Sequence, residues 1–376
     1  MKLTVGVGLL GCGTVGANVA DRLQRERDAI ERRSGTRYEL RAIAIRDPHK
    51  ERPESIERHL FTRDARRVID DPQVDLIIEL VGGVADAAEL VERALDRGRH
   101  VVTANKDLLA LQGPRLQALA TSRRTALRFE AAVAGAIPVL RTLDEALAGD
   151  EVLSVAGVVN GTCTSILSTM EQGVEFHEAL AHAQQLGYAE ANPANDVDGT
   201  DAAHKLALIA QLGFGLAVIS PRIRRTGITL VTQRDIARAR MMGLRIRLVV
   251  MTARTSGGIF AEVAPLLIPQ DHEFARTTGA ENVVHVAARD AGRLTLRGPG
   301  AGGVATASAV LGDVVTVLRA LGERRDPTLR GRANPLDPAI EVEPFFSRFA
   351  RAAELPNYPT WDDSVTSVPL QALANA

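Results

Sequence analysis

Three glycines near the start of the chain constrain the fold more than any other feature of the sequence. Gly11, Gly13 and Gly16 follow an apolar run at residues 3–10, and a helix-like segment follows at residues 17–33. Between a buried strand and a helix, this spacing permits a tight turn, an exposed backbone and close packing of the helix on the sheet. The pattern therefore predicts the first unit of a doubly wound parallel sheet.

The following hundred residues repeat the alternation of strand and helix. Further apolar runs at residues 39–45, 74–80 and 100–103 have strand character, and residues 85–97 have helix character. Strands that alternate with helices are typical of an α/β domain with a parallel sheet. We expect a Rossmann-like domain over residues 1–135.

The texture of the sequence changes after this domain and indicates a second, α+β domain at residues 136–304. It has three strand-like segments and a long helical stretch, at residues 152–159, 244–253, 293–296 and 165–210. A helix within residues 305–324 could return to the first domain, and a proline-rich tail occupies residues 325–376.

Composition excludes several classes of protein. The net charge is −1 and aromatic residues make up 3% of the chain, so we do not expect a nucleic-acid partner. Two cysteines provide no disulfide framework, which favours a reducing compartment such as the cytoplasm. No stretch has the length and charge-free character of a membrane span, so no membrane association is expected.

The glycine turn also predicts a ligand, because a helix N-terminus offers unpaired N–H groups to phosphates. Thr14 and Val15 lie within the turn, and Gly302 belongs to a second glycine-rich turn ahead of the returning helix. We expect a dinucleotide at this place. A glycine turn that serves only packing is the alternative.

The end of the second strand bears on the choice of dinucleotide. An acidic residue there selects NAD by accepting a hydrogen bond from the ribose 2′-hydroxyl. Arg46 stands in that position with Lys50 nearby, and both could meet a 2′-phosphate. NADP is therefore favoured, although Asp47 leaves NAD open.

Residues 187–205 contain the densest group of acid–base side chains. Asp201 and Lys205 are four residues apart, so on a helix they share one face, where a carboxylate can orient an ammonium group. Lysine occurs at only four positions among 45 basic residues, two of which are Lys106 and Lys205. Arginine does not release its proton near neutral pH, so the retained lysines are candidates for proton transfer.

Several motifs together resemble the homoserine dehydrogenase family from about Val5 to Leu321. They are the glycine turn and the segments at residues 79–83, 101–106, 129–138, 160–162 and 183–205. The resemblance implies an NAD(P)H-dependent oxidoreductase acting on a CH–OH group. Its reaction interconverts L-aspartate 4-semialdehyde and L-homoserine in threonine and methionine biosynthesis.

The resemblance also implies roles for individual residues. Lys205 resembles the family's proton donor, Lys106 its second active-site lysine and Asp196 a further active-site carboxylate. Substrate binding falls to Glu190, Asp201, Gly187 and Lys106, and cofactor binding to Gly11, Gly13, Thr14, Val15, Gly16, Arg46, Lys50, Thr103, Lys106 and Gly302. A sodium ion is implied at Glu130, Val133, Gly135 and Ile137.

The chain departs from the family at its end and in two turns. Many relatives carry a C-terminal ACT domain that senses threonine, whereas residues 325–376 are too few and too proline-rich to form one. Cys163 and Ala305 replace residues that are common in the family. Relatives are commonly homodimers, and we expect one here.

Two other functions are compatible with parts of the pattern. A non-catalytic dinucleotide-binding regulator would share the fold, but the retained lysines at 106 and 205 argue against it. A divalent-metal hydrolase could use the acids at residues 190–201. In that case Lys205 would repel the ion, and His204 is the only histidine nearby.

Overall fold

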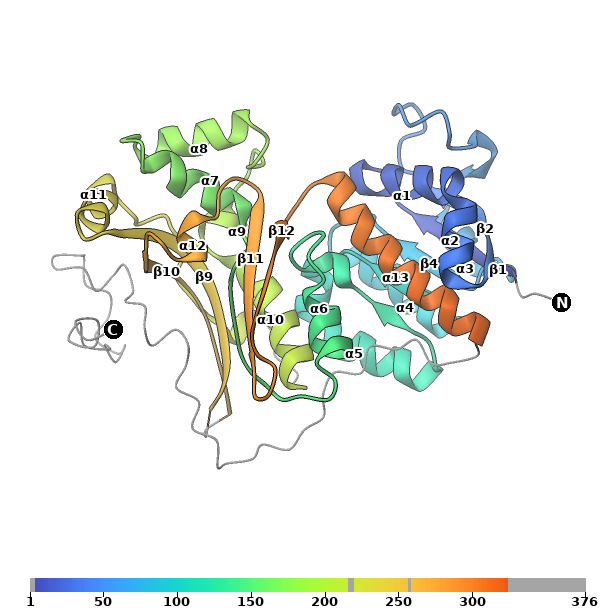
Figure 1. The fold of residues 1–376 in the computed structure, drawn as a ribbon. Coiled ribbons are helices and arrows are strands. Elements are labelled where there is room, and N and C mark those ends of the chain that lie inside the picture. The colour runs from blue at the N-terminus through green and yellow to red at the C-terminus, as the bar shows by residue number, and fades with distance from the viewer. Residues whose placement is uncertain (1–3, 216–219, 256–257, 324–376) are drawn as a thin grey trace. The chain divides into compact units, whose positions relative to one another are not determined.

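The computed structural model describes residues 4–215, 220–255 and 258–323, and these form two compact units (Figure 1). Unit 1 comprises the described residues up to Pro138 and those from Ala301 onward, and unit 2 comprises Val139–Gly300. The predicted proline-rich tail, residues 325–376, lies outside the described residues.

Unit 1 is built on a parallel six-stranded sheet with the order β3-β2-β1-β4-β5-β6. Its strands are β1 (Thr4–Leu10), β2 (Arg37–Ala44), β3 (Phe61–Thr62), β4 (Leu76–Glu79), β5 (His100–Thr103) and β6 (Leu127–Arg128). Its helices are α1 (Thr14–Arg25), α2 (Arg27–Ser34), α3 (Ala65–Asp70), α4 (Ala85–Asp96), α5 (Lys106–Arg123) and α13 (Gly303–Glu323), with short turns η1 (Arg58–Leu60) and η2 (Glu130–Ala132). The order reverses at β1 and β4, which is where doubly wound sheets bind ligands.

The side chains of β1 show why both faces of this sheet are covered. Val5, Val7 and Leu9 point into a core that α1, α2 and α13 complete. On the other face, a side chain at Gly8 would lie 2.6 Å from Val68 of α3. Because strands buried on both faces read as continuous apolar runs, the sequence could predict them.

Helix α13 comes from the end of the described chain and packs into the core of unit 1. Its buried residues are largely apolar, among them Val310, Val314, Val317 and Leu318. By length and composition alone, this helix is long and apolar enough to cross a membrane. The expectation that no stretch has this character is therefore wrong. Half of its most apolar window is buried within the protein, which is also typical of a core helix.

Unit 2 holds a six-stranded sheet with the order β12-β11-β7-β9-β10-β8, antiparallel except for the pair β10 and β8. Its strands are β7 (Val152–Val158), β8 (Arg224–Arg225), β9 (Leu244–Thr255), β10 (Gly258–Pro269), β11 (Glu281–Ala288) and β12 (Gly292–Pro299). The helical segments are α6 (Val139–Arg141), η3 (Thr142–Ala146), α7 (Gly161–Met170), α8 (Phe176–Gln185), α9 (Ala194–Val197), α10 (Thr200–Phe214), η4 (Ser220–Arg222), α11 (Gln233–Met241) and α12 (Glu273–Arg276). Helices α7 and α10 pack on β9, and α10 also packs on β7 and β10.

Candidate functional site

The first glycine turn is shaped by three different constraints. Gly11 has φ +90°, and a Cβ there would lie 2.4 Å from the Leu80 carbonyl oxygen. A Cβ on Gly16 would lie 2.1 Å from the carbonyl oxygen of Gly11. Gly13 differs, since its φ is −84° and a Cβ there would meet nothing within 4 Å. Packing therefore requires glycine at 11 and 16, whereas at 13 the open space lies at the start of α1, where a phosphate could approach the backbone.

The remaining predicted residues of this region lie close to the turn. Thr14 and Val15 form the first turn of α1. Gly302 has φ +113° and immediately precedes α13. A Cβ on the next residue, Gly303, would lie 2.9 Å from the Thr14 side chain, so this second glycine turn contacts the start of α1.

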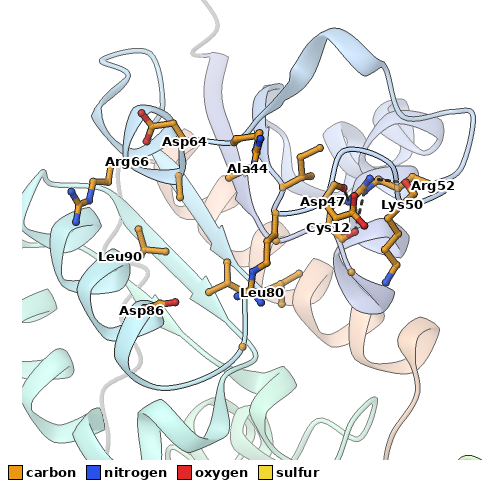
Figure 2. Close-up of a pocket in the computed structure, with 18 of the residues that line it drawn as sticks. Cys12, Ala44, Asp47, Lys50, Arg52, Asp64, Arg66, Leu80, Asp86 and Leu90 are labelled. Atoms are coloured by element: carbon orange, nitrogen blue, oxygen red, sulfur yellow. Dashed lines mark hydrogen bonds between the residues drawn. The ribbon is translucent and has the colours of Figure 1, made fainter.

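A pocket of about 760 Å³ opens beside the glycine turn (Figure 2). Its wall includes Gly11, Gly13, Arg46 and Lys50, all of which were predicted to bind a cofactor. The ends of β1, β2 and β4 supply the rim, together with the first turns of α3 and α4. Its volume is within the range of small-molecule and cofactor sites.

The pocket carries a surplus of exposed positive charge near the end of β2. Arg46 and Lys50 are exposed, and neither makes an ion pair with any residue that the structure describes. The Asp47 carboxylate accepts a hydrogen bond from the His49 amide at 2.8 Å. Arg52 donates to the carbonyls of Cys12, Asp47 and Lys50, and thereby ties this loop to the glycine turn. Arg46 and Lys50 therefore remain available to bind an anion, whereas the Asp47 carboxylate accepts a hydrogen bond within the loop.

At the carboxyl end of β5, next to the end of β4, Thr103 and Lys106 mark the step from β5 to α5. Thr103 is fully buried and its hydroxyl accepts from the Asn105 amide at 3.0 Å. Lys106 is the first residue of α5, and its Nζ lies 3.6 Å from an oxygen of Asp107. Its side chain is 32% exposed.

The predicted sodium ligands lie in a tight loop of unit 1. Glu130 is 4% exposed, and its amide donates to the Asp313 carboxylate at 2.8 Å. Ala134 and Gly135 both have positive φ, at 54° and 59°. A buried carboxylate beside a sharply turned backbone suits a hard cation, which prefers oxygen ligands.

Unit 2 contains a buried cluster around Lys205. The ammonium of Lys205 donates to Asp201 Oδ2 at 2.8 Å and to the Val159 carbonyl at 2.7 Å. The side chain is 14% exposed, and within the described residues its third N–H has no acceptor. The predicted i,i+4 pair therefore forms, and it holds Lys205 in place with one N–H group available to a ligand.

Asn160 connects two carboxylates of this cluster. Its Nδ2 donates to Asp196 at 2.7 Å and to Asp201 at 2.9 Å, while its Oδ1 caps α7 by accepting from the Cys163 amide. Burial, and then the negative charge of Asp201, raise the pKa of Asp196 above its ordinary value. One amide thus holds two acids that would otherwise repel each other.

Two predicted substrate residues do not take part in these contacts. Glu190 is exposed, and its carboxylate has no hydrogen bond or ion pair among the described residues. Gly187 is an exposed turn residue with φ +75°. The segment is held by the Thr162 hydroxyl, which donates to the Tyr188 carbonyl at 2.6 Å.

Comparisons with known proteins identify the family. The model described as "Homoserine dehydrogenase" matches residues 138–315, and "Homoserine dehydrogenase, NAD binding domain" matches residues 11–130. The homoserine dehydrogenase of Bacillus subtilis is 38% identical over 83% of this chain and 72% of its own length. That of Mycobacterium tuberculosis is 44% identical over 85% and 74%. The chain belongs to the homoserine dehydrogenase family.

Solved structures agree with this assignment. A homoserine dehydrogenase from Thiobacillus denitrificans has 38% identity and a TM-score of 0.82, covering 91% of this chain and 79% of that one. A hyperthermophilic archaeal homoserine dehydrogenase in complex with NADPH has 24% identity and a TM-score of 0.69, which shows the fold alone. The predictions of the family, of its mixed α/β fold and of an NAD(P)-dependent oxidoreductase are confirmed. The comparisons favour the homoserine dehydrogenase over a non-catalytic regulator.

Sequence reasoning underestimated two residues of this homoserine dehydrogenase. Asn160 follows β7 and received no role from the sequence, yet it bridges the Asp196 and Asp201 carboxylates. Glu79 ends the apolar strand β4 but is completely buried. The available signal was similar in both cases: a polar side chain at the end of an apolar strand.

Proposed function

We propose that this chain catalyses the NADPH-dependent reduction of L-aspartate 4-semialdehyde to L-homoserine and the reverse oxidation, within threonine and methionine biosynthesis. The observation that carries the proposal is the state of Lys205, held by two acceptors with a third N–H to spare. Bound NADPH supplies a hydride to the aldehyde carbon. The alkoxide so formed takes a proton from Lys205 Nζ, and solvent returns a proton to the amine.

The other residues divide the binding of substrate and cofactor. Asp196 and Asp201 orient the amide–lysine cluster, and Asp201, Glu190 and Gly187 bind the substrate. Glu190 meets the α-ammonium group, since an amino-acid substrate needs an anionic partner and this carboxylate is unengaged. Lys106 acts as the second lysine at the substrate and the cofactor.

For the cofactor we propose NADP over NAD. The turn formed by Gly11, Gly13, Thr14, Val15 and Gly16 would hold the pyrophosphate, with Thr103, Lys106 and Gly302 as further contacts. Arg46 and Lys50 meet the 2′-phosphate, which their unpaired charges support. Sodium is proposed at Glu130, Val133, Gly135 and Ile137.

A cytoplasmic homodimer completes the proposal. Both cysteines, Cys12 and Cys163, are free and buried, which suits a reducing compartment. The dimer is supported by the family resemblance, and light scattering of the purified chain would test it.

The decisive experiment follows NADPH absorbance with aspartate semialdehyde as substrate. Wild type should turn over, and Lys205→Ala should lower kcat by roughly 10²- to 10⁴-fold, as expected for loss of a proton donor. Absence of turnover by wild type with either nicotinamide cofactor would refute the enzyme. Full activity of Lys205→Ala would refute only the assignment of the proton donor.

A further inference from the structure

Glu79 is a buried acid in unit 1 that the proposed mechanism does not use. It ends β4 after three apolar residues and has no exposed surface. Within the described residues it makes no ion pair with any lysine or arginine. Burying a carboxylate without a cationic partner lowers the stability of the fold, so stability does not explain why a glutamate occupies this position.

Neutral donors surround the Glu79 carboxylate. Thr103 donates its hydroxyl hydrogen to Oε2 at 2.5 Å, and the Val81 amide donates to Oε1 at 2.8 Å. Burial raises the pKa of Glu79, while the hydrogen bonds from Thr103 and Val81 oppose the rise. An acceptor-only group is what such donors require.

The donors come from two different strand ends. Val81 and Gly82 follow β4 and form part of the pocket wall beside the glycine turn. Thr103 and Asn105 follow β5 and lead directly into α5, which begins at Lys106. The carboxylate therefore connects the pocket rim to the start of the helix that carries this lysine.

Asn105 strengthens the connection from the helix side. Its Oδ1 accepts from the Leu108 amide at 3.1 Å and so caps α5. Its Nδ2 lies 2.6 Å from the Gly83 carbonyl, which belongs to the rim loop after β4. The cap of α5 and the rim loop are thus joined twice, through Glu79 and through Asn105.

We propose that Glu79 is a positioning residue, which fixes the rim at Val81 and Gly82 and the start of α5 in one arrangement. It thereby sets the place of Lys106 at the start of α5 and touches neither substrate nor reacting atoms. The proposal rests on the function assigned above to Lys106 and to the pocket. It predicts that loss of the carboxylate weakens NADPH binding and lowers kcat through Lys106.

The test is Glu79→Gln in the full chain, which preserves size but turns an N–H₂ group toward N–H donors. We expect the NADPH dissociation constant, measured by fluorescence titration without substrate, to rise roughly tenfold, and kcat to fall roughly 10- to 100-fold. Glu92→Gln on α4 is the matched control, because this glutamate is partly exposed and pairs with Arg115 away from the rim loop. It should leave both quantities unchanged.

A double-mutant cycle separates positioning from general damage. In a Lys106→Met background, Glu79→Gln should cause little further loss of kcat, because Lys106 is the group through which it acts. Its effect on NADPH binding should persist. Additive losses in kcat, or unchanged NADPH affinity in Glu79→Gln, would overturn the proposal.

A second pair of variants covers the case in which Glu79→Gln fails to fold. Thr103→Val removes the hydroxyl between Glu79 and Asn105, and Thr103→Ser keeps it. The valine variant should lose kcat and the serine variant should recover most of it; equal activities would contradict the role. If the wild-type protein binds NADPH but does not reduce aspartate semialdehyde, only the proposed function is refuted. The NADPH titrations would still decide the role of Glu79.

Discussion

The pocket of unit 1 and the lysine cluster of unit 2 are built in opposite ways. The pocket relies on backbone and on exposed cations without partners, as at Gly13 and Arg46. In the cluster, Asn160 donates short hydrogen bonds to Asp196 and Asp201, and Lys205 donates to the Val159 carbonyl. The difference indicates that changes in the pocket should alter affinity with little effect on stability, whereas changes in the cluster should alter rate and stability together.

Among the variants that test this comparison, Asn160→Ala is expected to have the largest combined effect on rate and stability. The variant leaves two neighbouring carboxylates without their shared donor and removes the cap of α7, so kcat should fall roughly 10- to 100-fold. The free energy of unfolding should fall by about 1–3 kcal/mol, measured by urea titration. Asn160→Ser keeps a capping oxygen but cannot bridge the carboxylates, so it should recover stability without recovering rate. Recovery of both would show that the bridge is irrelevant to catalysis.

Two glycines of the turn provide the next test, because Gly13 lines the pocket and Gly16 packs against Gly11 instead. Gly16→Ala forces a Cβ against the Gly11 carbonyl and should destabilise the protein by about 1–3 kcal/mol. Gly13→Ala meets only open space and should leave the unfolding free energy within about 0.5 kcal/mol of wild type. The same variant should weaken NADPH binding roughly tenfold, a loss of about 1.4 kcal/mol. If Gly13→Ala binds NADPH normally, the backbone there does not contact the phosphates.

A smaller and more selective effect is expected from Arg46→Ala. Loss of its charge should raise KM for NADPH roughly tenfold and leave KM for NADH nearly unchanged, because only NADPH carries the 2′-phosphate. Arg32→Ala, an exposed arginine on α2, is the control. Equal changes for the two cofactors would remove Arg46 from the 2′-phosphate site.

The smallest effect is expected in the pH dependence of stability for Asp196→Asn. The pKa of Asp196 is raised in the folded protein, so its ionisation costs stability as pH rises through that pKa. Asparagine does not ionise, and the variant should therefore gain on wild type toward neutral pH and lose the gain in acid. Thermal melts between acid and neutral pH would measure it. A gain that grows toward low pH would give the opposite sign and contradict the pKa shift.

Much of unit 1 could be predicted because its strands are buried on both faces. The strand predicted at residues 100–103 coincides with β5, and the run at 3–10 agrees with β1 to within a residue. The helix predicted at residues 17–33 is instead two helices that meet at Glu26. Nothing in the local sequence, such as a proline, marks that break.

Unit 2 was harder to predict for a physical reason. Two of its long strands, β10 and β11, were not predicted at all, although β10 pairs with β9 along its whole length. Strand β11 pairs with β7, which lies far away in the sequence, and no local pattern reveals such a partner. The spacing of Asp201 and Lys205 did predict their contact, since an i,i+4 pair is local. The bridge from Asn160 to Asp201 spans 41 positions and became visible only in the fold.

The return of α13 to unit 1 has a consequence for synthesis on the ribosome. Arg128 and the Glu130 amide bind Asp313, and Val310, Val314 and Val317 complete the core under β1. The amino-terminal part of unit 1 therefore cannot bury its apolar surface until α13, at residues 303–323, has been synthesised. The described part of unit 2, Val139–Gly300, is uninterrupted in sequence and can mature first, which inverts the usual order in which nascent domains form. The amino-terminal part of unit 1 is where molecular chaperones would be needed most.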